Sequence, residues 1–371
     1  MFKIMHICNN YISSKVHLEL IRALSLKNDI EQSVFVPVRI KSDIGKLFIK
    51  KQNIKISYFN YRFSLLKYFP LIKVFIVFLG FLFSKDRQKP NIIIAHNFWS
   101  DGMIAFLNYI IYKTPYILVV RNTDMNVFLP RLKHYHWLMS VMVEKSNGLI
   151  FVNKIYKDSF EKKYPKIYIK SNNNTIIFNG VNQFWLCEKD FHGSYKRDDT
   201  LIFVGTFNKN KNLEAVIKAS EKLLIKRPNL KLIVVGGDEK EFKKLLNISV
   251  IPNFVQVMGK ILDKDKLRTL YRQSKIFIMP SFFETFGLVY IEALLQGCAV
   301  IHSKGQGIDG IFEQDFILSV DPDNVNDIAN KIEYLFQEFC IENTDSEFNL
   351  YLRELFDWNN IADQYLRTLQ K

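Results

Sequence analysis

The stretch Pro280–Gly297 reads PSFFETFGLVYIEALLQG and places two carboxylates, Glu284 and Glu292, in an otherwise mostly apolar segment. Its pattern predicts a strand that ends at the proline, a turn at Gly287, and a helix that the final glycine stops. Glu284 then belongs to a loop and Glu292 to the helix. The first N–H groups of such a helix are free donors, which suits an anion such as phosphate.

The two glutamates flank this anion-binding turn, and each carboxylate oxygen can accept two hydrogen bonds. A ligand with hydroxyl groups on both sides of a diphosphate matches this arrangement, so the stretch is interpreted as a nucleotide-sugar site. Upstream, the sequence GTFNKNKN (205–212) follows an apolar strand and precedes an amphipathic helix. Its two lysines, Lys209 and Lys211, can each neutralise the charge of a diphosphate.

Strands alternate with helices along the whole chain, which is typical of parallel sheets covered by helices. Strands are predicted at 3–8, 33–38, 54–59, 91–96, 116–122, 148–153, 175–179, 201–205, 231–236, 255–259, 275–280, 299–303 and 316–320. The clearest helical patterns are at 17–26, 132–144, 213–226, 264–273, 287–296 and 325–339. The fold class is therefore α/β, with two Rossmann-like, doubly wound domains that face a central cleft.

A length of 371 residues exceeds one ordinary hydrophobic core, so two domains are expected. The polar and unpatterned stretch 181–200 is predicted to be the linker. It separates an N-terminal domain, 1–180, from a C-terminal domain, 201–356. The start of the chain, MFKIMHICNN, is interpreted as a first strand rather than a signal peptide.

The hydrophobic share of 48% and the charged share of 24% are those of a folded protein. The four cysteines include no CxxC pair, which argues against a disulfide framework or a zinc site and fits a reducing compartment such as the cytoplasm. The net charge of +14 is concentrated in 45–90, where ten basic residues face one acid. No nucleic-acid-binding module is present in the sequence to use this charge.

The segment 45–90 has two interpretations. Its uncharged run, Val74–Phe83, has ten residues, whereas a spanning helix needs about 20. The segment is either a buried helix with solvated lysines around it, or an interfacial helix with its lysines toward anionic lipid. The second interpretation predicts a peripheral protein on the inner face of the plasma membrane.

From Val204 to Glu313 the chain resembles the donor half of the retaining glycosyltransferases of family 4, which have the GT-B architecture. The matching pieces include GTFNKNKN, VVGG, LYRQSKIFIMPS, ETFGLVYIEALLQGCAVI and GQGIDGIFE, in the family's order. PNIIIAHNFWSDG, TPYILVVRNTDMN and IIFNGVN resemble the acceptor half more loosely. The tail at about 357–371 resembles the terminal helix that packs back on the first domain.

The resemblance implies a role for each matching residue. Glu292 would bind the ribose hydroxyls, Glu284 would lie beside the donor sugar, and Lys211 would pair with the diphosphate. Backbone groups of the donor site are implied at Gly205, Thr206, Phe286, Gly287 and Leu288. Thr206 stands where the family often has an arginine, so Lys209 is expected to contribute charge. His96 and Asp124 would lie near the reacting carbon, with Arg121 and Asn122 on the acceptor side.

The function implied is transfer of a sugar from a nucleotide-diphosphate sugar to a glycan or lipid-linked acceptor, with retention of anomeric configuration. Surface-polysaccharide precursors are the typical acceptors of the family. No cofactor and no metal ion are expected, and Asp321–Asp323 (DPD) is interpreted as a loop that starts a helix. Two alternatives remain: a nucleotide-sugar isomerase (epimerase) on the same scaffold, and a non-catalytic basic protein that binds membrane surfaces.

Overall fold

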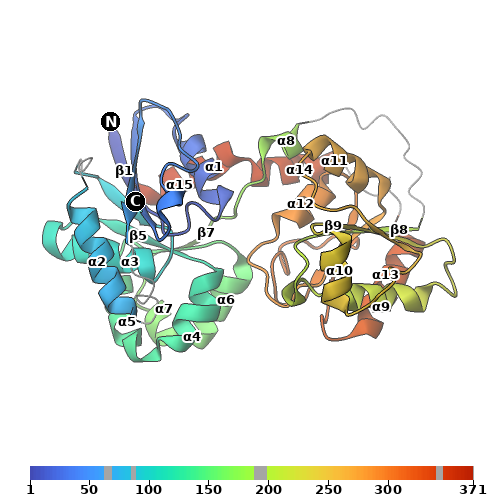
Figure 1. Ribbon diagram of the computed structural model, residues 1–371. Coiled ribbons are helices and arrows are strands. Elements are labelled where there is room, and N and C mark those ends of the chain that lie inside the picture. The colour runs from blue at the N-terminus through green and yellow to red at the C-terminus, as the bar shows by residue number, and fades with distance from the viewer. Residues whose placement is uncertain (62–68, 85–88, 188–198, 340–345, 371) are drawn as a thin grey trace. The chain divides into compact units, whose positions relative to one another are not determined.

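The computed structural model describes residues 1–61, 69–84, 89–187, 199–339 and 346–370 of the chain. These residues form two compact units (Figure 1). Unit 1 consists of residues 1–180 together with 358–371, and unit 2 consists of residues 181–357. Each unit is built on one parallel sheet with helices packed against it.

The sheet of unit 1 has the strand order β3-β2-β1-β4-β5-β6-β7, and all neighbouring strands are parallel. Its strands are β1 (Phe2–Ile7), β2 (Ile30–Val38), β3 (Ile54–Asn60), β4 (Ile92–Ala95), β5 (Tyr116–Val120), β6 (Leu149–Phe151) and β7 (Asn174–Ile176). The chain winds outward in one direction from β1 and in the other from β4. The carboxyl ends of these two strands are therefore a topological switch point, where ligands bind in open α/β sheets.

The helices of unit 1 are α1 (Lys15–Leu24), α2 (Pro70–Leu82), α3 (Ser100–Tyr112), α4 (Leu129–Arg131), α5 (His136–Glu144), α6 (Lys154–Lys163), α7 (Pro165–Tyr168) and α15 (Trp358–Leu369). Short 3₁₀ turns occur at Lys41–Asp43 and Lys133–Tyr135, and a π-helical turn at Asp124–Phe128. The last helix, α15, packs against α1, and Lys27 Nζ lies 2.6 Å from Asp363 Oδ1. The C-terminal segment therefore completes unit 1.

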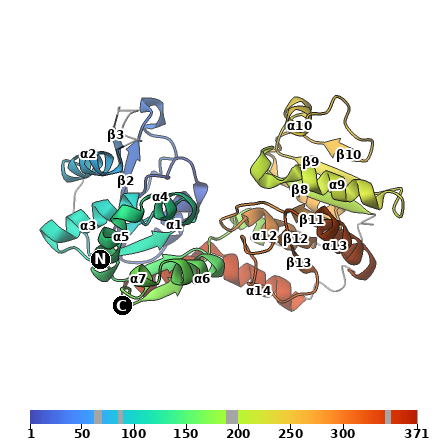
Figure 2. The same ribbon diagram turned by 90° about the horizontal axis from the view of Figure 1, so that it is seen from below.

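The sheet of unit 2 has the order β10-β9-β8-β11-β12-β13 and is also parallel. Its strands are β8 (Thr200–Val204), β9 (Lys231–Val235), β10 (Val255–Val257), β11 (Ile276–Met279), β12 (Ala299–Ser303) and β13 (Ile317–Val320). Its helices are α8 (Gln183–Leu186), α9 (Leu213–Leu223), α10 (Glu239–Leu246), α11 (Lys264–Gln273), α12 (Leu288–Leu294), α13 (Val325–Glu338) and α14 (Ser346–Phe356), with a 3₁₀ turn at Lys209–Lys211. The switch point of this sheet lies at β8 and β11 (Figure 2).

The central strands of both sheets form the cores. The strands β4 (IIIA), β5 (YILVV) and β8 (TLIFV) are buried at every position, because helices pack over the sheets. Burial of one such side chain contributes about 1.5–3 kcal/mol, so the continuous apolar runs that predict the strands also provide much of the stability.

The predicted α/β class with two doubly wound domains is confirmed. Each predicted strand is present, with ends that differ by a few residues, as strand and helix ends commonly do. The stretch expected to be a linker, 181–200, contains α8, which is part of unit 2. Residues 188–198 of that stretch lie outside the described residues. Among the described residues, no helix is long and apolar enough to span a membrane.

Candidate active site

The loop that follows β8 positions the predicted lysines. Asn208 caps the 3₁₀ turn, because its Oδ1 accepts a hydrogen bond from the Lys211 backbone N–H at 3.2 Å. The Asn208 side chain also donates to Thr206 Oγ1 at 2.8 Å. Lys209 is exposed, whereas Lys211 is partly buried. The cap therefore directs one lysine of the loop into the protein and leaves the other in solvent.

Lys211 and Glu284 form an ion pair at the switch point of unit 2. Lys211 Nζ lies 2.5 Å from Glu284 Oε2, and the two side chains are 20% and 13% exposed. The residues are 73 positions apart in sequence, and each belongs to a loop that leaves the carboxyl end of a central strand. The structure thus brings together the two charged groups that the sequence assigned to sugar and diphosphate.

The two loops are joined by Asn210. Its backbone oxygen accepts from the Phe282 N–H at 2.9 Å, its Oδ1 from the Phe283 N–H at 3.0 Å, and its Nδ2 donates to the Phe283 oxygen at 2.9 Å. These three bonds fix the loop after β11 against the loop after β8. The Lys211–Glu284 pair is therefore held by backbone geometry as well as by charge.

Two glycines make room for Glu284. Gly287 has φ +76°, and a Cβ there would lie 2.2 Å from the Tyr290 ring and 3.2 Å from Glu284 Cγ. Gly307 has φ +58°, and a Cβ there would lie 3.3 Å from Glu284 Cγ. Both conformations favour glycine. The backbone of Glu284 is tied to the same loop, since its oxygen accepts from the Gly307 N–H at 3.2 Å and its N–H donates to Gln306 Oε1 at 3.1 Å.

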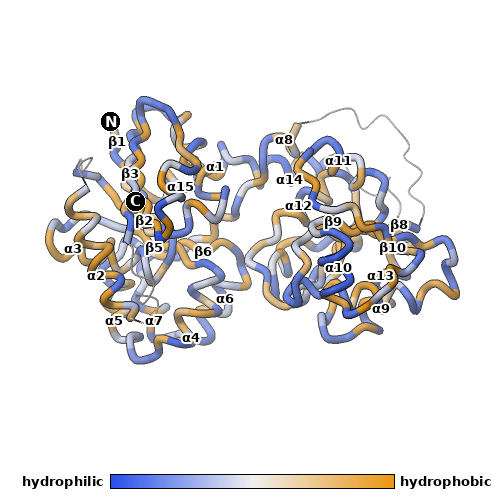
Figure 3. The backbone as a smooth tube through the Cα atoms, in the orientation of Figure 1, coloured by the Kyte–Doolittle hydropathy of each residue, from blue (hydrophilic) through white to orange (hydrophobic). Residues whose placement is uncertain are grey.

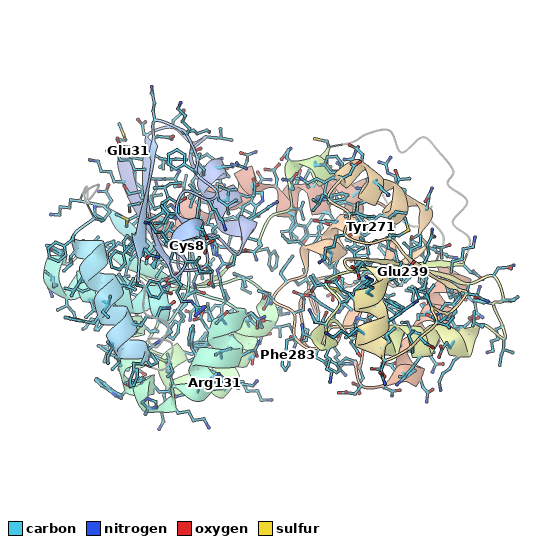
Figure 4. The ribbon with its side chains drawn as sticks, viewed as in Figure 1. Cys8, Glu31, Arg131, Glu239, Tyr271 and Phe283 are labelled. Carbon is cyan, nitrogen blue, oxygen red and sulfur yellow. The ribbon has the colours of Figure 1, made fainter. Side chains whose placement is uncertain are left out.

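Glu292 lies on α12 and is partly buried, in contact with the neighbouring helices of unit 2. Burial raises the pKa of its carboxyl group to about 7, while Lys264, the Tyr271 hydroxyl and the Trp185 indole lower it. Tyr271 is labelled in Figure 4 within unit 2. A carboxyl group with a pKa near neutrality and polar neighbours is able to bind hydroxyl groups in its ionised form.

The remaining donor-site residues have different surroundings. Gly205 directly follows β8, and its N–H donates to the Val235 oxygen at 2.9 Å. The Phe286 side chain is buried and packs against Phe356, with ring centroids 5.5 Å apart, so only its backbone can face a ligand. Gly287 and Leu288 are partly exposed, and α12 begins at Leu288.

In unit 1 the Asp124 carboxylate is fully buried and connects two loops. It accepts hydrogen bonds from the backbone N–H groups of Phe98 at 3.1 Å, Trp99 at 3.2 Å and Arg121 at 3.0 Å. Burial raises the pKa of Asp124 to about 7, although these three bonds lower it. With no exposed surface, this side chain organises the loops that follow β4 and β5.

His96 is also fully buried, and its Nε2 lies 3.0 Å from His6 Nδ1. Burial lowers the pKa of His96 well below its ordinary value, so the ring is neutral. Arg121 is partly buried and its Nε donates to the His96 backbone oxygen at 2.9 Å. Asn122 is partly exposed and its side-chain oxygen accepts from Asn126. Arg121 and Asn122 are thus the more accessible of the predicted residues in unit 1.

Sequence reasoning missed several polar residues around these sites. In unit 2 they are Gln306, Tyr271 and Trp185, and no pattern in the sequence shows that these side chains lie beside the two glutamates. In unit 1 they are Cys8 and His17, which gather around His96. The position of Cys8 at the exit of β1 could have suggested it, because neighbouring parallel strands end at the same edge of a sheet.

Comparisons with known proteins bear on the family and the fold. Residues 188–346 match the family model described as glycosyl transferases group 1. An uncharacterized glycosyltransferase of Methanocaldococcus jannaschii is 24% identical over 300 residues, which cover 75% of this chain and 74% of the relative. An O-antigen chain mannosyltransferase of Salmonella typhimurium is 23% identical over 296 residues, covering 74% of this chain and 78% of the relative.

Among solved structures, Anabaena HepE in complex with UDP and glucose superposes with a TM-score of 0.68 at 16% identity, and the match covers 100% of each chain. Two doubly wound parallel-sheet domains of this kind are the GT-B fold of glycosyltransferases. Together with the family match over most of unit 2, this shows that the chain is similar to group 1 glycosyltransferases. The predicted resemblance is confirmed at this level.

Proposed function

We propose that this protein is a retaining glycosyltransferase of the family 4 type. It moves a hexose from a nucleoside-diphosphate sugar to a lipid-linked glycan, a precursor of a surface polysaccharide. Unit 2 binds the donor, and unit 1 binds the acceptor through Arg121 and Asn122. The observation that carries the proposal is the Lys211–Glu284 pair at the switch point of unit 2.

The pair suits the charge changes of the reaction. Negative charge grows on the leaving diphosphate while the sugar carbon becomes positive, and preorganised charges stabilise both. An ammonium group has three donors, so Lys211 can keep Glu284 and also bind a phosphate oxygen. The carboxylate beside it then lies where it can contact the sugar hydroxyls and the developing positive charge. HepE, which has the same fold, was crystallised with UDP and glucose, a nucleoside diphosphate and a sugar.

Glu292 supplies the anchor for the nucleoside. Its carboxylate can accept both ribose hydroxyls, and the nearby Tyr271 and Trp185 favour the ionised form that this contact needs. The donor is thereby held at two carboxylates with the diphosphate near Lys211. Lys209, exposed in the same loop, adds positive charge.

Retention follows from a same-face displacement in which the leaving phosphate accepts the proton of the acceptor hydroxyl. Because Lys211 provides the positive charge beside the diphosphate, the proposed transfer requires no metal ion and no cofactor. His96 and Asp124 have no exposed surface, so no proton transfer is assigned to either side chain. The mechanism therefore rests on the charged groups of unit 2.

The lipid-linked nature of the acceptor is supported by helix α2. Its residues Ile72, Phe75 and Leu79 are exposed at helical spacing on one side, and Phe83 just beyond the helix is 81% exposed. The helix is among the most hydrophobic segments in Figure 3. Exposed lysines, among them Lys46, Lys50 and Lys51, precede it in the chain. Apolar side chains with nearby cations suit an anionic membrane surface. Residues 62–68 and 85–88 of the segment lie outside the described residues.

The donor and the stereochemistry can be tested together. A panel of nucleotide-sugars is screened by thermal shift, and those that bind are incubated with lipid extracts while nucleoside diphosphate release is measured. We expect at least one donor to raise the Tm and to be consumed only when lipid acceptor is present. NMR of the product should show the anomeric configuration of the donor. A protein that binds no nucleotide-sugar, or that inverts the configuration, would refute the proposal.

Membrane binding has its own test. Co-sedimentation with vesicles is expected for anionic but not for zwitterionic lipid, and it should weaken as salt rises because exposed charges are screened. Changing Phe75 to serine should reduce it, since the side chain is 58% exposed and would enter the bilayer interface. The control is Ile225→Ser in unit 2, which removes an even more exposed apolar side chain (93%) and is expected to leave membrane binding unchanged.

A further inference from the structure

Three side chains that commonly bind metal ions converge at the carboxyl end of β1 in unit 1. One of them, Cys8, is labelled in Figure 4. Cys8 follows β1, His17 lies in the first turn of α1, and His96 follows β4. The Cys8 Sγ and one ring nitrogen of each histidine lie within 4.8 Å of one another. The three residues come from separate elements, and each is at most 1% exposed.

A chain of hydrogen bonds determines which nitrogen of His96 carries its proton. The amide of Gln32 donates to the Ile21 oxygen at 3.0 Å, so its Oε1 faces His6 Nε2, also at 3.0 Å. His6 must therefore be protonated at Nε2, which leaves its Nδ1 as an acceptor. Since His6 Nδ1 lies 3.0 Å from His96 Nε2, His96 donates from Nε2. Its Nδ1 then carries a bare lone pair.

This arrangement is the one found around metal ligands. A histidine that binds a metal through one ring nitrogen usually donates a hydrogen bond from the other, which fixes its tautomer and orientation. Here the acceptor is His6, which Gln32 holds in turn. His96 Nδ1 and His17 Nδ1 are both buried and have no hydrogen-bond partner in the described part of the chain. Buried polar atoms without partners are rare in proteins and require an explanation.

We propose that Cys8 Sγ, His17 Nδ1 and His96 Nδ1 bind one zinc ion. One thiolate and two imidazoles are a ligand set that zinc prefers, at bond lengths of about 2.0–2.3 Å. At these bond lengths the ligand atoms of one tetrahedral ion lie about 3.5 Å apart. The distances between the three ligand atoms must therefore shorten by about 1 Å when the ion binds. The ion supplies the missing partner of both Nδ1 atoms. It crosslinks β1, α1 and the loop after β4, and the proposed sugar transfer does not use it.

The charges around the cluster are compatible with a cation. Asp101 and Arg121 both act electrostatically on Cys8, and in opposite directions: Asp101 raises the pKa of the thiol and Arg121 lowers it. Asp101 accepts hydrogen bonds from the Asn9 N–H and from the Asn97 side chain, so it remains beside the thiol without being needed as a ligand. Burial raises the pKa of the Cys8 thiol well above its usual value. Without an ion the thiol therefore keeps its proton, and it becomes a thiolate as the ion binds.

The full-length protein tests this site directly. After treatment with a chelator, one equivalent of Co²⁺ is added as a spectroscopic probe, and zinc is then added to displace it. We expect a thiolate-to-cobalt charge-transfer band, d–d bands typical of tetrahedral coordination, and loss of both when zinc is added. Elemental analysis of untreated protein should give about one zinc per chain. A protein that binds neither ion, or binds cobalt without the charge-transfer band, overturns the proposal.

Variants assign the site to these residues. Cys8→Ser should abolish the charge-transfer band, and His17→Asn should lower cobalt affinity by about tenfold or more. Cys187→Ser removes an exposed thiol, and Cys298→Ala a buried thiol whose Sγ donates to the Tyr271 oxygen. Both controls should keep the band. If a control loses it while Cys8→Ser retains it, the ion lies elsewhere and the proposal is wrong. The wild-type spectrum decides the question even where a variant fails to fold.

Discussion

The switch points of the two sheets have the same topology but different surroundings. In unit 1 the residues that follow β1 and β4, Cys8 and His96, are completely buried. In unit 2 the loops that follow β8 and β11 contain Lys211 and Glu284, whose side chains are 20% and 13% exposed. One strand-end site is filled with protein side chains, and the other leaves charged groups accessible to solvent.

The difference shows that topology alone does not create a ligand site. Both sheets bring polar residues from separate loops to one edge. In unit 1, Asp124 accepts from backbone N–H groups and His96 pairs with His6, so these side chains face other protein groups rather than solvent. In unit 2 the glycines beside Glu284 leave space around its side chain. The Lys211–Glu284 pair is partly exposed, and the ammonium group of Lys211 has donors to spare for a ligand. These two properties distinguish it from the buried polar residues of unit 1.

The largest effect is expected from Glu284→Gln. The amide has nearly the same shape, so the hydrogen bond to Lys211 can remain while the negative charge is lost. If the carboxylate stabilises the developing positive charge, turnover should fall by about 10²–10³-fold with little change in donor Kd. Steady-state kinetics and calorimetric binding of the donor measure the two quantities.

The matched control for Glu284→Gln is Glu214→Gln. It removes a carboxylate that also pairs with a lysine in unit 2, at 2.6 Å from Lys218, but on an exposed helix surface. Turnover of this control should equal that of the parent. If Glu284→Gln and the parent had equal turnover, the proposal that the switch point of unit 2 is a reactive site would be wrong.

A smaller effect, confined to unit 1, is expected from Asp124→Asn. An amide presents an N–H where the carboxylate accepted a backbone N–H, and such an unsatisfied buried donor costs about 1–3 kcal/mol. Hydrogen exchange at Phe98, Trp99 and Arg121 should therefore speed up by about 5–150-fold, whereas the donor Kd of unit 2 should not change. The matched control is Asp263→Asn, because Asp263 caps α11 and also accepts from two backbone N–H groups but is exposed. The effect of this change on local hydrogen exchange should be weaker. A weakened donor Kd would instead give Asp124 a role at the site.

The smallest effect is the pH dependence of donor binding. Burial raises the pKa of free Glu292 to about 7. Ribose hydroxyls that bind the carboxylate favour its charged form and lower this pKa in the complex, so binding releases a proton near neutrality. Donor affinity should be nearly constant above pH 8 and fall through pH 7, reaching about tenfold weaker at pH 6.

Calorimetry in buffers of different ionisation enthalpy detects the released proton. Glu292→Gln should bind weakly and without this pH dependence, and a parent protein that shows none would contradict the ribose assignment.

The fold and the donor loops were predictable because their signals are local. Apolar runs such as IIIA and YILVV, alternating with helical patterns, are typical of buried strands. Gly287, between Glu284 and Glu292, indicates a turn between a loop and a helix. The surroundings of Glu292 were not predictable, because Trp185 and Tyr271 reach it from α8 and α11. The burial of His96 and Asp124 was missed for the same reason. A histidine after a strand can face solvent or core, and only the packing of α1 and the neighbouring loops decides which.

By itself the amino-acid sequence determined the two parallel sheets, the order of their strands along the chain, and the identity of the charged residues at the strand ends. Hydrophobic periodicity and glycine positions suffice for this, because they act over a few neighbouring residues. Only the tertiary structure decided that Lys211 meets Glu284, and that Cys8, His17 and His96 are enclosed together. Those outcomes depend on contacts between residues up to 88 positions apart, whose distances are fixed when the sheets assemble and their helices pack.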